Sequence, residues 1–79
     1  MTVNVRDAIE KIDEEILRLV ADRVTLCQEA QEEDPEILGE EYRSDSLAHW
    51  VGFGDEHGWN PAATIRAGKC LLDLCRQEE

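Results

Sequence analysis

Residues 5–34 constrain the fold more than any other segment, because they predict a helix that is too long for its own domain. Apolar residues recur there in alternating steps of four and three: Val5, Ile9, Ile12, Ile16, Leu19, Leu26 and Ala30. This spacing is typical of one face of an α-helix. No Gly or Pro interrupts the pattern before Asp34. We therefore expect a helix of about 30 residues, or about 45 Å.

Such a helix cannot bury its apolar face within a chain of 79 residues. A second apolar line widens that face: Leu17, Val20, Val24 and Cys27. A core of this size supplies only a few kcal/mol, and oligomerisation is a common way to add more. The sequence therefore predicts a homodimer.

Breaks in the chain predict two further helices. Asp34-Pro35 ends the first helix, because the residue before proline avoids the helical conformation. We expect a second helix over Glu40–Val51, followed by a loop at the three glycines of residues 52–58. Asn60-Pro61 is a strong start for a third helix, which we expect to run toward Gln77. The prediction is one all-α domain over residues 1–79, with one long helix and two shorter ones.

The formal net charge of −11 excludes whole classes of partner. Nucleic acids and anionic membrane surfaces both require a cationic surface on the protein. No apolar run approaches the roughly 20 residues that a membrane span requires. The acidic run Glu29–Glu41 is expected to be a solvated face, with a docking surface for a basic partner as the alternative.

The three cysteines, Cys27, Cys70 and Cys75, form no C-x-x-C motif and cannot all pair. No signal peptide is visible in the sequence. These features favour the reduced environment of the cytoplasm. We therefore expect the three side chains to be small buried hydrophobic groups.

Arg23 is the anomaly of the first helix, because it lies on the apolar stripe between Leu19 and Leu26. A buried guanidinium is unfavourable unless it is paired. It could pair with an acidic residue such as Asp13 or Glu10 of a neighbouring helix, or extend its head group to water. It could instead bind an anionic ligand between helices.

Arg6 adds a geometric constraint on that site. It lies 17 residues before Arg23, so the two Cα atoms are roughly 25 Å apart along one helix. A single small molecule cannot touch both arginines of one chain. If two copies of the helix run antiparallel, Arg6 of one copy approaches Arg23 of the other, and two-fold symmetry repeats the site.

Histidines and aromatic residues give weaker signals. His49 and His57 match no metal-ligand spacing, so we expect no metal and no cofactor. Trp50, Phe53 and Trp59 cluster around the glycine-rich segment. They are expected to close the end of the small core, or alternatively to form an exposed surface for a partner.

The segment Val5–Val24, VRDAIEKIDEEILRLVADRV, resembles the first helix of the all-helical class of chorismate mutases. The match comprises an Arg near the helix start, the Ile12-Asp13 pair, and a second Arg 17 residues after the first. Residues 41–44 (EYRS) fall where that family opens its second helix with an Arg-Glu pair. Residues 57–61 (HGWNP) resemble the start of its third helix. The resemblance covers nearly the whole chain.

The resemblance implies an entwined all-helical homodimer that rearranges chorismate to prephenate without a metal or cofactor. That reaction requires the substrate to be held in its reactive conformer, with cations on its carboxylates. By position, Arg23 would bind one carboxylate, Arg6 of a second copy would bind the other, and Arg43 would help to order the site. Three further residues fall at ligand-contacting positions of the family: Ser44, Cys75 and Glu79.

Asp34 departs from the family pattern. The family places a Lys there, which bonds a carboxylate and the ether oxygen, whereas an acid repels a dianion. Two functions follow. The chain could be an isomerase acting weakly, or with a partner enzyme, on chorismate or a related small dicarboxylate. Alternatively, it could be a non-catalytic binding, docking or regulatory subunit in aromatic or secondary metabolism.

Overall fold

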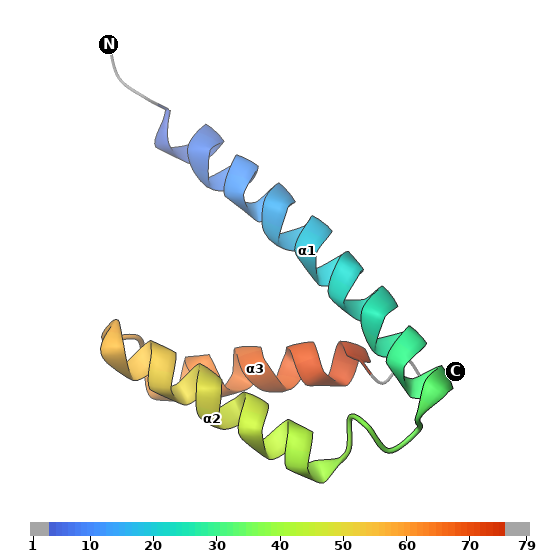
Figure 1. Ribbon diagram of the computed structural model, residues 1–79. Helices are drawn as coiled ribbons and strands as arrows, with labels where there is room; N and C mark the ends of the chain where they lie inside the picture. Colours follow the sequence, from blue (N-terminus) through green and yellow to red (C-terminus); the bar gives the residue numbers. More distant parts are fainter. Residues whose placement is uncertain (1–3, 76–79) are drawn as a thin grey trace.

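The computed structural model describes residues 4–75, which form three α-helices joined by two short connections (Figure 1). The helices are α1 (Val5–Glu33), α2 (Glu40–Glu56) and α3 (Pro61–Cys75). No β-strand occurs within residues 4–75. The prediction of an all-α chain with one long helix and two shorter ones is confirmed.

The ends of α1 follow from its local sequence. Asn4 caps the N-terminus, since its side-chain Oδ1 accepts a hydrogen bond of 3.2 Å from the backbone N–H of Asp7. At the other end Asp34 adopts an extended conformation before Pro35. The Asp34 carboxylate accepts a hydrogen bond of 3.1 Å from the Glu36 N–H and so stabilises the turn.

The C-terminal end of α2 differs from the prediction. The expected loop after Val51 is wrong, because α2 continues to Glu56 through Gly52 and Gly54. His57 is the C-terminal cap of α2, and Gly58 follows it with a φ of 72°, which suits glycine. This end is a Schellman motif: the Trp59 N–H donates to the Gly54 carbonyl at 2.9 Å, and the Gly58 N–H donates to the Asp55 carbonyl at 3.3 Å.

Close packing of α2 against α3 explains why glycine is tolerated inside a helix. A Cβ atom at Gly54 would lie 2.9 Å from the Thr64 Oγ1 of α3. A Cβ atom at Gly68 of α3 would lie 3.1 Å from the Leu47 side chain and 3.2 Å from that of Trp50. The two glycines therefore let the helices approach closely, which outweighs the weaker helix propensity of glycine.

The start of α3 is as predicted. Asn60 accepts a hydrogen bond of 3.0 Å from the Ala63 N–H, and Pro61 occupies the first helical position. The described part of α3 ends at Cys75, so the predicted continuation toward Gln77, and Glu79 with it, lie outside the described residues.

α1 packs on the rest of the molecule through its C-terminal part alone, while its N-terminal part extends away from α2 and α3 (Figure 1). Six of the stripe residues are between 50% and 67% exposed: Val5, Ile9, Ile12, Ile16, Leu19 and Leu26. The core within one chain is correspondingly small. Its most deeply buried side chain is Leu72 of α3, which is 1% exposed.

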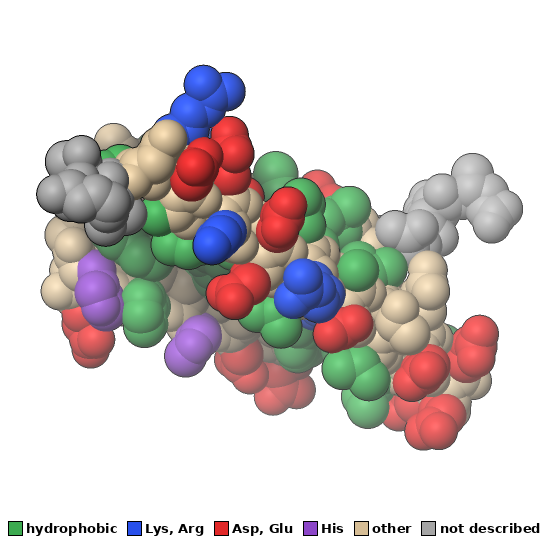
Figure 2. All heavy atoms as spheres, turned by 90° about the horizontal axis from the view of Figure 1, so that it is seen from above, with side chains coloured by type: hydrophobic (Ala, Val, Ile, Leu, Met, Phe, Trp, Pro, Cys, Tyr) green, Lys and Arg blue, Asp and Glu red, His purple; other side chains and the backbone are tan. Residues whose placement is uncertain are grey.

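Charged and apolar side chains are mixed on the face of the molecule that Figure 2 shows. Each described acidic residue of the run Glu29–Glu41 is exposed, as predicted for a solvated face. Within the described residues, no helix combines the length and the apolar character needed to cross a bilayer.

Candidate functional site

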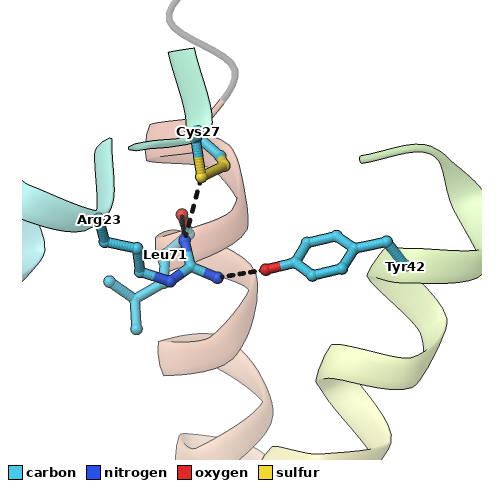
Figure 3. Close-up of a disulfide and its surroundings, with 5 residues drawn as sticks. Arg23, Cys27, Tyr42 and Leu71 are labelled. Atoms are coloured by element: carbon cyan, nitrogen blue, oxygen red, sulfur yellow. Dashed lines mark hydrogen bonds between the residues drawn. A yellow bond between two sulfur atoms is a disulfide. The ribbon is translucent and has the colours of Figure 1, made fainter. Parts of the chain in front are cut away.

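Arg23 lies where the three helices meet (Figure 3). Its half-buried guanidinium donates through Nη2 to the Tyr42 hydroxyl of α2 at 3.0 Å. Through Nη1 it donates to the Leu71 carbonyl of α3 at 3.2 Å, and Nη1 also lies 4.0 Å from the Cys27 Sγ. The side chain is therefore held between all three helices.

The acceptors of Arg23 are neutral. Tyr42 offers a hydroxyl and Leu71 a backbone carbonyl, and neither cancels the positive charge. Within residues 4–75 no carboxylate forms an ion pair with Arg23, and Glu10 pairs instead with Arg6. Hydrogen bonding thus fixes the direction of the guanidinium without neutralising it. A cation held in this way can attract an anion, because partial burial weakens screening by water.

A disulfide beside Arg23 corrects the prediction for the cysteines. Cys27 of α1 is bonded to Cys75 of α3, with their Cα atoms 5.6 Å apart (Figure 3). Cys70, in contrast, is free and exposed. Cys27 and Cys75 are buried as expected, although they form a disulfide, whereas the expectation of burial is wrong for Cys70. Spacing could not identify the pair, because 48 residues separate its members. Only the packing of α1 on α3 brings them together.

Cys75 was predicted from the resemblance to contact a ligand. In the structure it is buried, and its sulfur is joined to Cys27. The sulfur therefore has no thiol proton to donate to a ligand while the bond is intact.

The other predicted arginines lie apart from Arg23. Arg6 is exposed, and its Nε donates to the Glu10 carboxylate at 3.1 Å. Arg43 of α2 lies 3.6 Å from the Asp73 carboxylate of α3. Within one chain Arg6 and Arg23 belong to the same straight helix, so the structure does not bring them together. Ser44 lies next to Arg43 on α2 and is exposed.

The region around Asp34 is acidic. Asp34 itself is exposed and serves as the C-terminal cap of α1. The following turn and the start of α2 border a hollow of about 680 Å³, lined by Pro35, Glu36, Ile37, Gly39, Glu40, Glu41, Tyr42 and Asp45. Four of these eight residues carry carboxylates and none carries a positive charge, so the hollow disfavours a dianion.

Sequence reasoning missed the residues that hold Arg23. No role was predicted for Tyr42, and the backbone carbonyl of Leu71 leaves no signal in a pattern of side chains. A usable signal was the hydroxyl of Tyr42, since a half-buried arginine without an acid needs oxygen acceptors. Within the described residues, no group of three or more His, Cys, Asp or Glu side chains is arranged to hold a metal ion.

In comparisons with protein-family models, with curated proteins and with solved structures, no match to this chain was found.

Proposed function

We propose that this chain forms a chorismate mutase-like homodimer that binds chorismate or a related enolpyruvyl dicarboxylate near Arg23. In this proposal the rearrangement to prephenate is weak, or it depends on a partner enzyme. The observation that carries the proposal is the Arg23 guanidinium, which is held by Tyr42 and Leu71 and has no carboxylate partner among residues 4–75. Arginine suits such a ligand because its planar fork matches a carboxylate.

The apolar stripe of α1 supports the dimer. An exposed row of six large aliphatic side chains is unfavourable in water, and covering each one contributes about 1.5–3 kcal/mol. A second α1 running antiparallel would cover the stripe. It would also bring Arg6 of the second copy toward Arg23, which one chain alone does not do.

The dimer is tested with Ile12→Gln, compared with Lys11→Gln as the control on a neighbouring, off-stripe position. In a symmetric dimer the Ile12 change acts twice, so we expect the dimer dissociation constant to rise about 100-fold or more. The Lys11 change should leave it within a few-fold of the wild type. Sedimentation equilibrium measures both. Equal dissociation constants for the two variants would refute the antiparallel stripe.

Ligand binding is tested by calorimetry with chorismate. Arg23→Ala should abolish binding, while Arg18→Ala removes an exposed cation from the same helix and should leave binding nearly unchanged. Unchanged binding by the Arg23 variant would exclude Arg23 from the site. Circular dichroism of both variants separates a lost contact from a lost fold.

Chorismate turnover is measured for the wild type and for an Asp34→Lys variant, which restores the cation of the family pattern. A positive charge near the breaking ether bond stabilises the transition state, and each 1.4 kcal/mol gives about tenfold in rate. We expect the variant to gain at least about tenfold over the wild type. An absence of turnover in both proteins would exclude an isomerase that acts on chorismate without a partner enzyme.

A second candidate is a non-catalytic subunit that keeps the fold and binds, docks or regulates. Asp34 favours it, because an exposed acid next to four further carboxylates opposes the catalysis of a dianionic substrate. Under this function the wild type binds chorismate but does not convert it, and a partner enzyme of aromatic or secondary metabolism carries the chemistry.

A further inference from the structure

The turn from α2 to α3 carries a cluster of exposed aromatic rings. Phe53 is stacked on His57 with ring centroids 4.2 Å apart, and Trp59 lies 5.4 Å from Phe53 and 5.7 Å from His57. The His57 Nδ1 lies 2.9 Å from the Phe53 carbonyl, which fixes its ring against the helix. Phe53 is 46% exposed and Trp59 is 48% exposed. Phe53 and Trp59 therefore form the exposed aromatic surface that was the alternative prediction, whereas Trp50 is half-buried and packs against Gly68 of α3.

The cluster is held rigidly by the helix end itself. The Schellman motif of α2 places Trp59 two residues past its capping residue, and the usual apolar contact of that motif is here the contact between Trp59 and Phe53. A binding partner would therefore meet rings already in place, which lowers the entropy lost on binding.

The rings border two adjoining hollows. One, of about 280 Å³, is lined by His49, Trp50, Phe53 and Trp59. The other, of about 320 Å³, shares His49 and Phe53 with the first and adds the Glu56 carboxylate. A cation lying over the aromatic rings would thus have a carboxylate within the same surface. None of the residues that line either hollow is a Lys or an Arg.

Charge on this side of the molecule also favours a cation. Asp55 and Glu56 directly precede His57, and both are exposed. Figure 2 shows acidic side chains beside the two histidines, at the end of the molecule where α2 turns into α3. The chain as a whole carries a net charge of −11, which attracts basic partners over a distance of about 10 Å.

We propose that the aromatic hollow between His49, Trp50, Phe53 and Trp59 binds an arginine side chain from a basic segment of a partner protein. A guanidinium suits both parts of the site, because it stacks on aromatic faces and pairs with a carboxylate through two N–H groups. The volume of the first hollow accommodates one such head group. This surface is separate from Arg23 and does not depend on the proposed function.

Intrinsic fluorescence tests the proposal directly, because the two tryptophans of the chain, Trp50 and Trp59, both line the hollow. The probe is an end-blocked pentapeptide of alternating arginine and glycine, titrated into the full chain at low salt. The matched probe contains citrulline, which has the shape of arginine without its charge. We expect saturable quenching or a spectral shift with the arginine peptide, and at least about fivefold weaker binding of the citrulline peptide.

Two variants locate the site. Glu56→Gln should weaken arginine-peptide binding about two- to fivefold, whereas Glu15→Gln, which removes an equivalent exposed charge from α1, should not change it. Trp59→Ala should weaken binding by a similar factor, and Trp59→Phe should restore most of it because a ring is retained. Circular dichroism of each variant verifies that the helices persist.

Three results would overturn the proposal. The citrulline peptide binding as tightly as the arginine peptide would mean that charge is not recognised. Tetramethylammonium binding as tightly as the peptide would identify a small-cation site instead of a protein-docking site. Absence of any fluorescence response in the wild type, with both tryptophans shielded from acrylamide, would mean that a second copy of the chain covers the hollow.

Discussion

Removing the covalent bond between Cys27 and Cys75 is the perturbation whose effect on folding can be calculated most directly. The bond closes a loop across a sequence separation of 48 residues. In the chain-entropy account, a loop of this length disfavours the unfolded state by about 4 kcal/mol at about 25 °C. A core as small as this one supplies roughly 3–5 kcal/mol in all. The disulfide therefore contributes about as much as the core, and its loss should remove about half of the free energy of unfolding.

Urea denaturation at fixed protein concentration measures the effect. The oxidised wild type is compared with the reduced wild type and with Cys27→Ala/Cys75→Ala, and Cys70→Ser is the control because that thiol is exposed and unpaired. With a urea dependence of about 1–2 kcal/mol per M, the midpoint should fall by about 2–4 M. Fixed concentration matters because association of chains also shifts the midpoint.

Either of two results would refute a stabilising role for the Cys27–Cys75 disulfide. Alkylation of the non-reduced protein could reveal three free thiols, in which case the bond does not form. Alternatively, the bond could be present by mass spectrometry while oxidised and reduced proteins unfold at the same urea concentration. In that case, closing a loop across 48 residues would not lower the conformational entropy of the unfolded chain by the calculated amount. The Cys70 variant should match the wild type within about 0.5 kcal/mol.

Four further variants test local features by urea or thermal unfolding. Gly54→Ala should destabilise the chain by about 1–3 kcal/mol, since its new methyl group meets α3. Gly52→Ala should stabilise the chain by up to about 1 kcal/mol, because no atom lies close to that position. Equal changes in the free energy of unfolding for the two variants would contradict the close contact between α2 and α3. Tyr42→Phe removes a hydrogen-bond acceptor from the charged Arg23 and should cost about 1.5–3 kcal/mol, so a neutral result would mean that water replaces the hydroxyl. Asn60→Ala should lose about 1 kcal/mol of cap stabilisation, and no loss would show that Pro61 alone starts the helix.

Local signals in the sequence predicted the helix starts well, and they failed where long-range packing decides. Asn4 and Asn60 cap α1 and α3 because capping depends on residues within one turn. The end of α2 was placed too early, because nothing near Gly54 in sequence reports that Thr64 lies against it. At Gly54 the absence of a side chain lets α2 pack closely on α3, so this glycine is a packing residue and not a helix breaker.

For the candidate site, too, the sequence predicted the residue with a local signal and missed the partners that come from other helices. Arg23 was identified from its place on the apolar stripe, since a cation is conspicuous there. Its partners Tyr42 and Leu71 come from other helices, and the backbone carbonyl of Leu71 leaves no sequence signal. The disulfide was missed for the same reason, because Cys27 and Cys75 approach only when α1 packs on α3.

The covalent tie at one end of α1 and its uncovered N-terminal part have a consequence for amide hydrogen exchange. Near Cys27 the backbone is anchored to α3, so its amides should exchange only through global unfolding. From Val5 to about Ile16 the helix of a single chain has exposed apolar side chains, so its amides should exchange by fraying. A second copy covering the stripe would protect these amides too. The difference in amide protection between the two ends of α1 would then decrease as the fraction of associated chains increases.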